Sequence, residues 1–382
     1  MVSGPGGIRA TVFLPDGRPR GTSVISGPPF RSREEDTIKA VVFHEHGDVN
    51  VLRYEDAPDP KLGPKDVLVR VRASGTNYND VWARRGLAGV KFDLPHISGS
   101  DVSGQVVEVG SAVTMANVGD AVVSHPSLSC RVCEACTSGR EYFCRQFKIW
   151  GFQTGPYDGG YAELARLPEA NVLPKPANLS WEEAASMPLV LLTAWHMLDT
   201  RAQLKPGEDV LLWGASSGIG VIGIQVAKLF GARAIAVAGT DAKCAKAKTL
   251  GADETINYNT QDVVQEVRRL TNKKGVEVVF EHTGAGTWER SLASMAWGGR
   301  LVICGNTTGY EAKTDLRFLF NKQLSLLGSH QGSKAELVRG MREVAAGRIK
   351  PVVDSVLPLR DAKKAQEKIE AGDHFGKIVL VP

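Results

Sequence analysis

The sequence has few aromatic residues and no long hydrophobic run. Phe, Trp and Tyr supply 7% of its 382 residues, and no run of about 18 apolar residues occurs, so we expect no transmembrane helix. An excess of one charge is also missing, because 46 basic residues are set against 42 acidic ones, for a formal net charge of +4. So small and dispersed an excess indicates neither a nucleic-acid nor a membrane partner. The apolar fraction of 43% is instead typical of a soluble α/β protein with a sizeable core.

The first 36 residues lack the apolar segment of a secretory signal. They are rich in Gly, Pro and Ser and contain five arginines. The prolines and glycines also argue against the amphipathic helix of an organelle transit peptide. We therefore predict a flexible amino-terminal tail over residues 1–36 and a cytoplasmic location.

Cysteine is scarce except in one short segment. Four of the six cysteines fall within fifteen residues, which favours a metal site over a disulfide framework. Four thiolates in one loop match a closed tetrahedral Zn²⁺ site of structural type, and an iron–sulfur cluster is the alternative. Cys244 and Cys304 are interpreted as ordinary packed thiols. The predicted metal ligands are Cys130, Cys133, Cys136 and Cys144.

The length predicts two domains of different type. From residue 38, short strands punctuated by Gly and Pro indicate a β-rich domain with a barrel-like core. Ser180 and Glu183 form a predicted capping box at a helix start. From residue 210, strands and helices alternate, which predicts a doubly wound parallel sheet. Two short β segments near residues 352 and 378 are expected to return to the first domain.

The segment from Val210 to Ala238 predicts a dinucleotide-binding unit. A buried strand leads through a turn of small residues into a helix, and a second strand follows. Backbone N–H groups at the start of that helix would face a pyrophosphate. The residues expected there are Ser217, Gly218, Ile219 and Gly220.

The end of the second strand indicates which nucleotide binds. An acidic residue there would hold a ribose 2′-hydroxyl, whereas this sequence has Ala238-Gly239-Thr240 followed by Lys243. A neutral pocket with a nearby ammonium would attract a 2′-phosphate. We therefore expect NADPH rather than NADH. The alternative is that Lys243 only solvates its helix, and Asp241 weakens the positive field.

At this point the chain resembles the medium-chain dehydrogenase/reductase superfamily. The four-Cys loop, Thr193-Ala194-Trp195 and Gly251-Ala252-Asp253 carry the resemblance over residues 38 to 382. It implies an α/β protein, with a GroES-like β-rich catalytic domain over 37–168 and 335–382. It also implies a Rossmann NADP-binding domain over 169–334 and a homodimer or homotetramer.

The catalytic zinc of the family's alcohol dehydrogenases does not carry over. Their three ligand positions correspond here to Asn77, to the Gly99-Ser100-Asp101 stretch and to Leu189. A catalytic zinc needs three protein ligands and an open position, and Asp101 alone could serve. We therefore expect chemistry without a Lewis-acid metal.

What remains resembles the quinone oxidoreductases and the enoyl-thioester reductases, and above all the crotonyl-CoA carboxylase/reductase group. The shared stretches are 77–83, 99–101, 149–153, 279–282 and 328–330. Gln153 stands where that group has a glutamate in its CO₂ pocket. A four-Cys loop is also unusual for the group. We therefore expect simple reduction of a small-molecule substrate.

Such a reduction needs donors for a developing enolate and a proton source. The predicted catalytic residues are Tyr78, Asn77, Asn79 and His282. The other predicted cofactor-binding residues are Thr193, Thr240, Lys243, Tyr258, Gly305, Asn306 and Ser329. We interpret His44, His46, His96, His125, His196 and His374 as structural. The alternatives are an NADP-dependent alcohol dehydrogenase that keeps its structural zinc, and a non-catalytic NADPH-binding protein.

Overall fold

The computed structural model describes residues 37–153 and 157–382. The predicted flexible tail lies outside these residues. Within them the α/β fold class is confirmed, since a β-rich part and a parallel sheet with helices on both faces are present. Among the described helices none combines the length and apolar character that crossing a bilayer requires. The cytoplasmic location stays a prediction.

The β-rich part consists of two main sheets. The first has the order β2-β1-β4 and the second the order β10-β6-β5-β3-β18-β17, with β9 paired to β3. Along β3, Val67, Val69 and Val71 alternate toward a buried cluster, as a half-buried strand requires. The bounds are β1 Thr37–Phe43, β2 Arg53–Pro58, β3 Asp66–Gly75, β4 His96–Ile97, β5 Asp101–Val109, β6 Ala121–Ser124, β9 Leu164–Pro168, β10 Val172–Pro174, β17 Val353–Pro358 and β18 Lys377–Val381.

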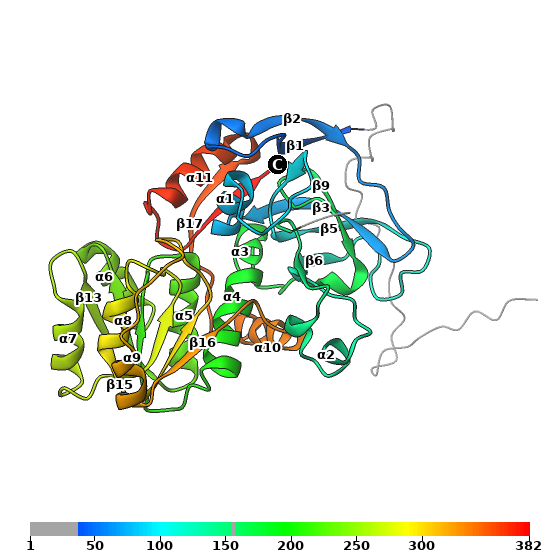
Figure 1. The fold of residues 1–382 in the computed structure, drawn as a ribbon. Coiled ribbons are helices and arrows are strands. Elements are labelled where there is room, and N and C mark those ends of the chain that lie inside the picture. The colour runs from blue at the N-terminus through cyan, green and yellow to red at the C-terminus, as the bar shows by residue number, and fades with distance from the viewer. Residues whose placement is uncertain (1–36, 154–156) are drawn as a thin grey trace, which may run out of the picture. The chain divides into compact units, whose positions relative to one another are not determined.

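The carboxyl-terminal strands join this second sheet. β18 pairs antiparallel with β3, so that Val379 faces Gly75 and Leu380 faces Ser74. In Figure 1 the red carboxyl-terminal segment, with β17 and α11 (Ala362–Glu370), lies among the blue and cyan elements, near β1 and α1 (Tyr78–Arg85). Residues from both ends of the described chain therefore meet at the end of β3.

The parallel sheet has the order β13-β12-β11-β14-β15-β16. The central strands consist of buried apolar residues because helices cover both faces of the sheet. Leu212 packs into the cluster of α5, whereas Leu211 packs into the cluster of α7 and α8. The bounds are β11 Asp209–Leu212, α5 Gly218–Leu229, β12 Arg233–Ala238, α6 Asp241–Thr249, β13 Glu254–Asn257, α7 Val263–Leu270, β14 Val276–Glu281, α8 Trp288–Ser294, β15 Met295–Ile303, α9 Leu316–Lys322 and β16 Ser325–Gly328.

A buried helical segment follows the β-rich part. The predicted capping box is confirmed at α3 (Trp181–Ala185), where Glu183 N donates to Ser180 Oγ at 3.1 Å and Ser180 N donates to Glu183 Oε2 at 2.8 Å. α4 (Pro188–Trp195) is buried throughout, packs on α5 and α10 (Lys334–Ala345), and continues as a π-helix over His196–Arg201. The shorter elements are α2 Glu134–Thr137, β7 Ser127–Leu128, β8 Lys148–Ile149 and the 3₁₀ turns Val49–Val51, Glu141–Phe143, Glu169–Asn171 and Leu359–Asp361.

Candidate active site

The turn between β11 and α5 lies where the strand order of the parallel sheet reverses, between β11 and β14. Ser217 caps α5, and its Oγ accepts from Gly220 N at 3.0 Å. Gly214 has a φ of +56°, and a Cβ on Gly220 would lie 2.2 Å from Gly214 O. The turn therefore needs glycine at both positions. The amino end of α5, with Ser217 to Gly220, offers the donors that a pyrophosphate requires.

His282 lies against this turn. Its Nε2 is 2.9 Å from Trp213 O and 3.4 Å from Ser217 Oγ. Because a backbone carbonyl can only accept, Nε2 carries the proton. Burial lowers the pKa of His282, so the ring is neutral at neutral pH. The predicted catalytic residue His282 and the predicted cofactor residue Ser217 are thus neighbours.

Lys377 joins the turn to the β-rich part. Its aliphatic stem packs on the start of α5, since a Cβ on Gly218 would lie 2.6 Å from Lys377 Cδ. Its ammonium donates to Thr76 O at 2.6 Å, to Asn77 Oδ1 at 2.6 Å and to Asp101 Oδ2 at 3.2 Å. Sequence reasoning missed this residue. The available signal was a single lysine opening an otherwise apolar strand.

The three positions of the alcohol dehydrogenase zinc ligands do converge here. Asn77 Nδ2 donates to Asp101 Oδ2 at 2.9 Å, and Leu189 N donates to Asp101 Oδ1 at 2.8 Å. Together with Lys377 these residues form a buried cluster, which we call the Asp101 cluster. The amide of Asn77 is therefore engaged at both its nitrogen and its oxygen.

A second buried carboxylate borders the Asp101 cluster. Asp80 Oδ2 accepts from Asn77 N at 2.7 Å and from the Tyr161 hydroxyl at 2.8 Å. Complete burial raises the pKa of Asp80 to about 6, against the lowering effect of these hydrogen bonds. The pKa of Tyr161 lies well above its usual value, because its hydroxyl is buried beside this carboxylate. Tyr161 therefore keeps its hydroxyl proton, and Asp80 is the member of the pair that can take up a further proton near pH 6.

Tyr78 and Asn79 form the first turn of α1, a helix that sequence reasoning did not anticipate. Both side chains are half-buried. The ring of Tyr78 meets that of Trp82 edge to face, with centroids 5.2 Å apart. Since Trp82 lines a cavity of about 700 Å³, Tyr78 lies one helical turn from that cavity.

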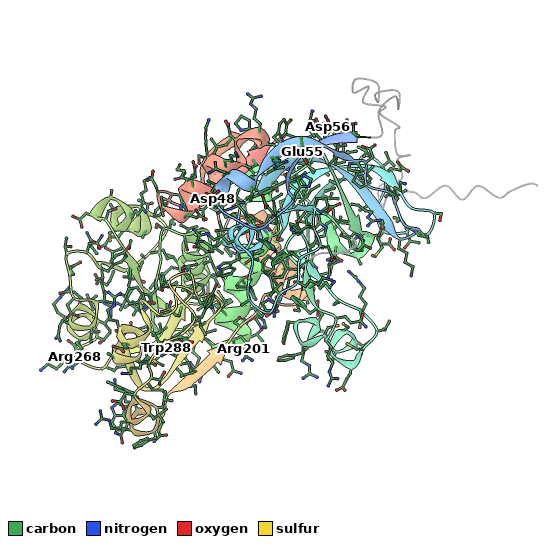
Figure 2. All side chains as sticks on the ribbon, turned by 45° about the horizontal axis from the view of Figure 1, so that its top comes forward. Asp48, Glu55, Asp56, Arg201, Arg268 and Trp288 are labelled. Atoms are coloured by element: carbon green, nitrogen blue, oxygen red, sulfur yellow. The ribbon has the colours of Figure 1, made fainter. Side chains whose placement is uncertain are left out.

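A cavity of about 700 Å³ extends from the carboxyl ends of β15 and β16 toward the β-rich part. It brings together three predicted nicotinamide residues, Gly305, Asn306 and Ser329. Two histidines, His196 and His330, also line it. Arg201 and Trp288, labelled in Figure 2, are further lining residues. The cavity has room for a nicotinamide and part of a substrate.

Cys304 lines this cavity, whereas Thr193 is not among its lining residues. Thr193 is buried in α4, and its hydroxyl donates to Leu189 O at 2.7 Å. Cys304 lies one residue beyond β15 rather than inside a strand, and it lines the cavity. Burial raises the pKa of the Cys304 thiol to about 12, so the thiol is protonated at neutral pH. It is not a thiolate nucleophile.

The residues predicted for the 2′-phosphate lie around the end of β12. Thr240 caps α6, where its Oγ1 accepts from Lys243 N at 3.2 Å. The Lys243 ammonium donates to Gly372 O at 2.6 Å, which uses one of its three N–H groups. The hydroxyl of Tyr258 lies 2.6 Å from the position of a Cβ on Gly239. Thr240, Lys243 and Tyr258 therefore surround the end of one strand.

Asp241 is the acidic residue that weakens this positive field. Its Oδ1 accepts from Asn257 Nδ2 at 2.7 Å, which ties the carboxylate to the end of β13. Part of its negative charge is thus compensated by an amide donor.

The four clustered cysteines come together in the loop around α2. One Sγ from each residue lies within 4.8 Å of the others. Hydrogen bonds from Val132 N and Cys133 N lower the pKa of the Cys130 thiol to about 6. Cys133 is the N-cap of α2, and hydrogen bonds with the Cys130 and Cys136 thiols raise the pKa of its own thiol to about 11. Four sulfur atoms at this spacing are the donor set of a closed tetrahedral metal site, which Cys130, Cys133, Cys136 and Cys144 would hold.

Comparison with known families matches this architecture. The Alcohol dehydrogenase GroES-like domain family matches residues 63–177, and the Zinc-binding dehydrogenase family matches residues 218–346. The crotonyl-CoA reductase of Streptomyces avermitilis is 34% identical over 363 residues, which cover 86% of this chain and 81% of that protein. The chain belongs to the medium-chain dehydrogenase/reductase superfamily. The resemblance drawn from the sequence is confirmed, and the protein is an enzyme of the oxidoreductase class.

Solved structures of this superfamily share the fold. One described as an NAD-dependent alcohol dehydrogenase is 47% identical, with a TM-score of 0.86, over 90% of this chain and 99% of that one. The 2-octenoyl-CoA carboxylase reductase CinF, in complex with NADP and 2-octenoyl-CoA, is 34% identical, with a TM-score of 0.82, over 91% of this chain and 88% of that one. Relatives with alcohol and with enoyl-thioester substrates therefore both occur at this similarity.

Proposed function

We propose that this superfamily member is an NADPH-dependent reductase of an activated C=C bond, in an enoyl thioester or enone, or of a quinone. The observation that carries the proposal is the Asp101 cluster. At the positions of three zinc ligands it has an amide, a carboxylate and a backbone N–H, and its cation is the Lys377 ammonium. Reduction without a catalytic zinc follows from this donor set, because a site needs three metal ligands and this one offers a single carboxylate.

NADPH is the proposed cofactor. The amino end of α5 receives the pyrophosphate, and Thr240, Lys243 and Tyr258 surround the 2′-phosphate. The NADP in the CinF complex supports the assignment. When bound, the cofactor supplies a hydride to the acceptor. The 47% identical alcohol dehydrogenase is described as NAD-dependent, so the cofactor ratio must be measured on this chain.

Residues of the chain stabilise the charge that forms on the acceptor. As the β-carbon is reduced, negative charge moves to the carbonyl oxygen, and donors fixed at that oxygen lower the barrier. Tyr78 and Asn79 are the proposed donors, because they form the first turn of α1, and the Tyr78 ring contacts Trp82, which lines the cavity. Asn77 and His282 act as positioning residues, since their polar atoms are held by Asp101, Lys377 and Trp213 O.

The four-Cys loop holds a structural Zn²⁺. The sulfur atoms form a closed donor set with no open position, and the loop has few buried apolar residues to fold it otherwise. An iron–sulfur cluster is the alternative. Zinc content near one ion per chain without iron supports zinc, and iron with visible absorbance supports the cluster.

Reduction proceeds without carboxylation. Gln153 replaces a glutamate of the crotonyl-CoA carboxylase/reductase motif, and a neutral amide lacks the charge of that carboxylate. Measuring product mass with and without bicarbonate tests this point. Equal products support simple reduction, and a product heavier by one carboxyl group contradicts it.

The proposed domains are 37–168 with 335–382 and 169–334, and the pairing of β18 with β3 supports the split first domain. The proposed homodimer or homotetramer forms along β16. This edge strand and its neighbours expose Trp297, Leu316 and Phe320 at 71%, 67% and 67%. An apolar sheet edge of this kind favours association. Sedimentation of the protein tests it, with a monomer as the contrary result.

An oxidation screen with NADPH tests the function. Crotonyl-CoA, a simple enone and a quinone are each offered as acceptors, with NADH in parallel. Steady oxidation of NADPH by one of them supports the proposal. Alcohol-dependent reduction of NADP⁺ or NAD⁺ would instead favour an alcohol dehydrogenase. Tight NADPH binding with no turnover would favour a non-catalytic binding protein.

A further inference from the structure

A buried histidine–carboxylate pair opens onto the large cavity. His196 begins the π-helix that continues α4, and it lines the cavity together with Gly305, Asn306 and Ser329. Its Nδ1 lies 2.9 Å from Glu336 Oε1. The two side chains are 1% and 3% exposed, so this contact is shielded from water. Sequence reasoning treated His196 as structural because Glu336 is 140 residues away.

Glu336 is ionised across the neutral pH range. Burial alone would raise its pKa, but hydrogen bonds from His196, Ser333 and Thr200 lower it to about 2. Ser333 N and Ser333 Oγ donate to Oε2 at 2.6 and 2.9 Å, and the Thr200 hydroxyl donates to Oε1. An ionised carboxylate can only accept, so the proton of His196 that faces it is on Nδ1. Nε2, on the opposite edge of the ring, is left for proton exchange.

A second cavity reaches Glu336 but is not lined by His196. It measures about 690 Å³ and is lined by Thr200, Ser333 and Glu336, with the exposed Arg339 and Arg342 at its rim. Tyr142 lines both cavities, and its ring lies on that of His196 with centroids 4.4 Å apart. The pair thus lies between a cavity with an exposed rim and the cavity of the predicted nicotinamide residues.

The groups around His196 come from four elements. Glu336 belongs to α10, Tyr142 to the 3₁₀ turn Glu141–Phe143, and His330 to the loop after β16. Asp199 and Arg201 lie on the same π-helix. Asp199 pairs with Arg339 at 3.2 Å and so is engaged elsewhere. Glu336 is therefore the charged side chain whose hydrogen bond fixes the orientation of the His196 ring.

We propose that His196 is the acid that protonates the α-carbon of the reduced acceptor, and that Glu336 is its positioning residue. This inference rests on the proposed function. A bound nicotinamide would supply hydride to the β-carbon and be oxidised in turn, and the negative charge would then lie on the carbonyl oxygen of the acceptor. The acid is the His196 ring with a proton on both nitrogens: its Nε2–H bond breaks, a C–H bond forms at the α-carbon of the enolate, and neutral imidazole with its Nδ1 proton facing Glu336 remains. A proton taken up at Nε2 from water in the cavity that His196 lines restores the acid.

A purely structural role would also keep His196 buried, since Glu336 closes a capping box with Ser333 at the start of α10. The test therefore needs a measurement that packing alone does not change. The position of deuterium in the product is such a measurement. An acid fixed on one side of the α-carbon places deuterium from D₂O on one face, whereas solvent water places it on both.

The experiment compares H196N, E336Q and H44N in the full-length protein with an enoyl thioester or enone that the wild type reduces. In H196N the amide can still donate to Glu336, but no acid remains. We expect kcat to fall about 100-fold or more, NADPH affinity to change less than about threefold, and deuterium to appear on both faces. H44N alters another His–Glu pair, that of His44 and Glu55 at 2.6 Å, and should leave kcat unchanged.

E336Q serves if H196N does not fold, because Gln can still accept from Ser333. We expect kcat to fall about tenfold and facial selectivity to weaken. A downfield Nδ1–H proton resonance should be present in the wild type and shifted in E336Q. The assignment would be overturned if H196N kept the wild-type kcat and labelled a single face. It would also be overturned if kcat and single-face labelling were lost in H330N and not in H196N. Failure of the proposed function is distinct, since the wild type itself then reduces no acceptor while the resonance still reports on the pair.

Discussion

The ammonium of Lys377 and the carboxylate of Asp101 are 3.2 Å apart, with side chains 4% and 0% exposed. Such a buried pair repays its desolvation only when the remaining polar atoms are satisfied. Here they are, because Thr76 O and Asn77 Oδ1 accept from the ammonium and Leu189 N donates to the carboxylate. The charge balance of the cluster therefore depends on both partners.

Removing one partner should destabilise the fold strongly. In K377M the carboxylate of Asp101 loses its counter-charge in a buried site, and we expect the free energy of unfolding to fall by about 3–5 kcal/mol. Urea unfolding followed by tryptophan fluorescence measures the change. The double variant D101N/K377M removes both charges and should recover most of the loss. If K377M alone costs less than about 1 kcal/mol, the pair is not buried as described.

Asp80 should make stability depend on pH. Burial raises the pKa of its carboxyl to about 6 from a reference of 3.8, so the folded state binds the proton more tightly than the unfolded state. Its contribution is therefore fully present below about pH 4 and is lost as pH rises toward 6. The difference between the folded and unfolded pKa values of Asp80 corresponds to about 3 kcal/mol of unfolding free energy.

The difference in unfolding free energy between wild type and D80N isolates this effect. As pH rises from 4 to 7, we expect the unfolding free energy of the wild type to fall by up to about 3 kcal/mol relative to that of D80N. Urea unfolding in matched buffers measures this change. The control is D158N, since the pKa of Asp158 is also raised by burial, although less strongly. A difference that is flat across this range would mean that Asp80 is solvated.

Lys243 should set the choice of cofactor. In K243A one ammonium near the 2′-phosphate is lost, and we expect KM for NADPH to rise about tenfold while KM for NADH stays within about twofold. Steady-state kinetics with both cofactors provides the measurement. K246A is the matched control on α6, because Lys246 lies over the Phe375 ring. A wild-type rate ratio for NADPH over NADH near one would contradict the assignment.

Removal of the loop metal should unfold the four-Cys loop locally. Because the loop closes around four sulfur atoms, C144S should lose the metal and become sensitive to proteolysis between residues 130 and 148. Elemental analysis and limited digestion with trypsin measure both effects. C244S, a change in a buried cysteine outside the cluster, should retain the metal. Full metal content in C144S would exclude that residue as a ligand.

The sequence was sufficient for features that neighbouring residues determine. The strand–turn–helix unit at residues 209–229 and the Ser180–Glu183 capping box are short-range patterns, and both are present as expected. The bounds of α8 and β15 are set differently, since β15 begins with a pairing of Met295 to Val276 beyond a bulge. Pairing across a sheet is not encoded in local periodicity.

Contacts between distant residues explain what was missed. Asp101 and Lys377 are 276 residues apart, and His196 and Glu336 are 140 apart. Lys377 lies in no motif, and Glu336 belongs only to the local capping pattern that begins at Ser333. The proposed role of each depends on its distant partner. The convergence of Asn77, Asp101 and Leu189 was accessible because a family resemblance aligned them, not because spacing places them together.

The position of Lys377 has a consequence for biosynthesis. A ribosome exposes Asp101 and the glycine turn long before it delivers the strand that begins with Lys377. During translation the Asp101 carboxylate therefore stays hydrated until β18 pairs with β3. The Asp101 cluster can therefore form only after β18 has been synthesised.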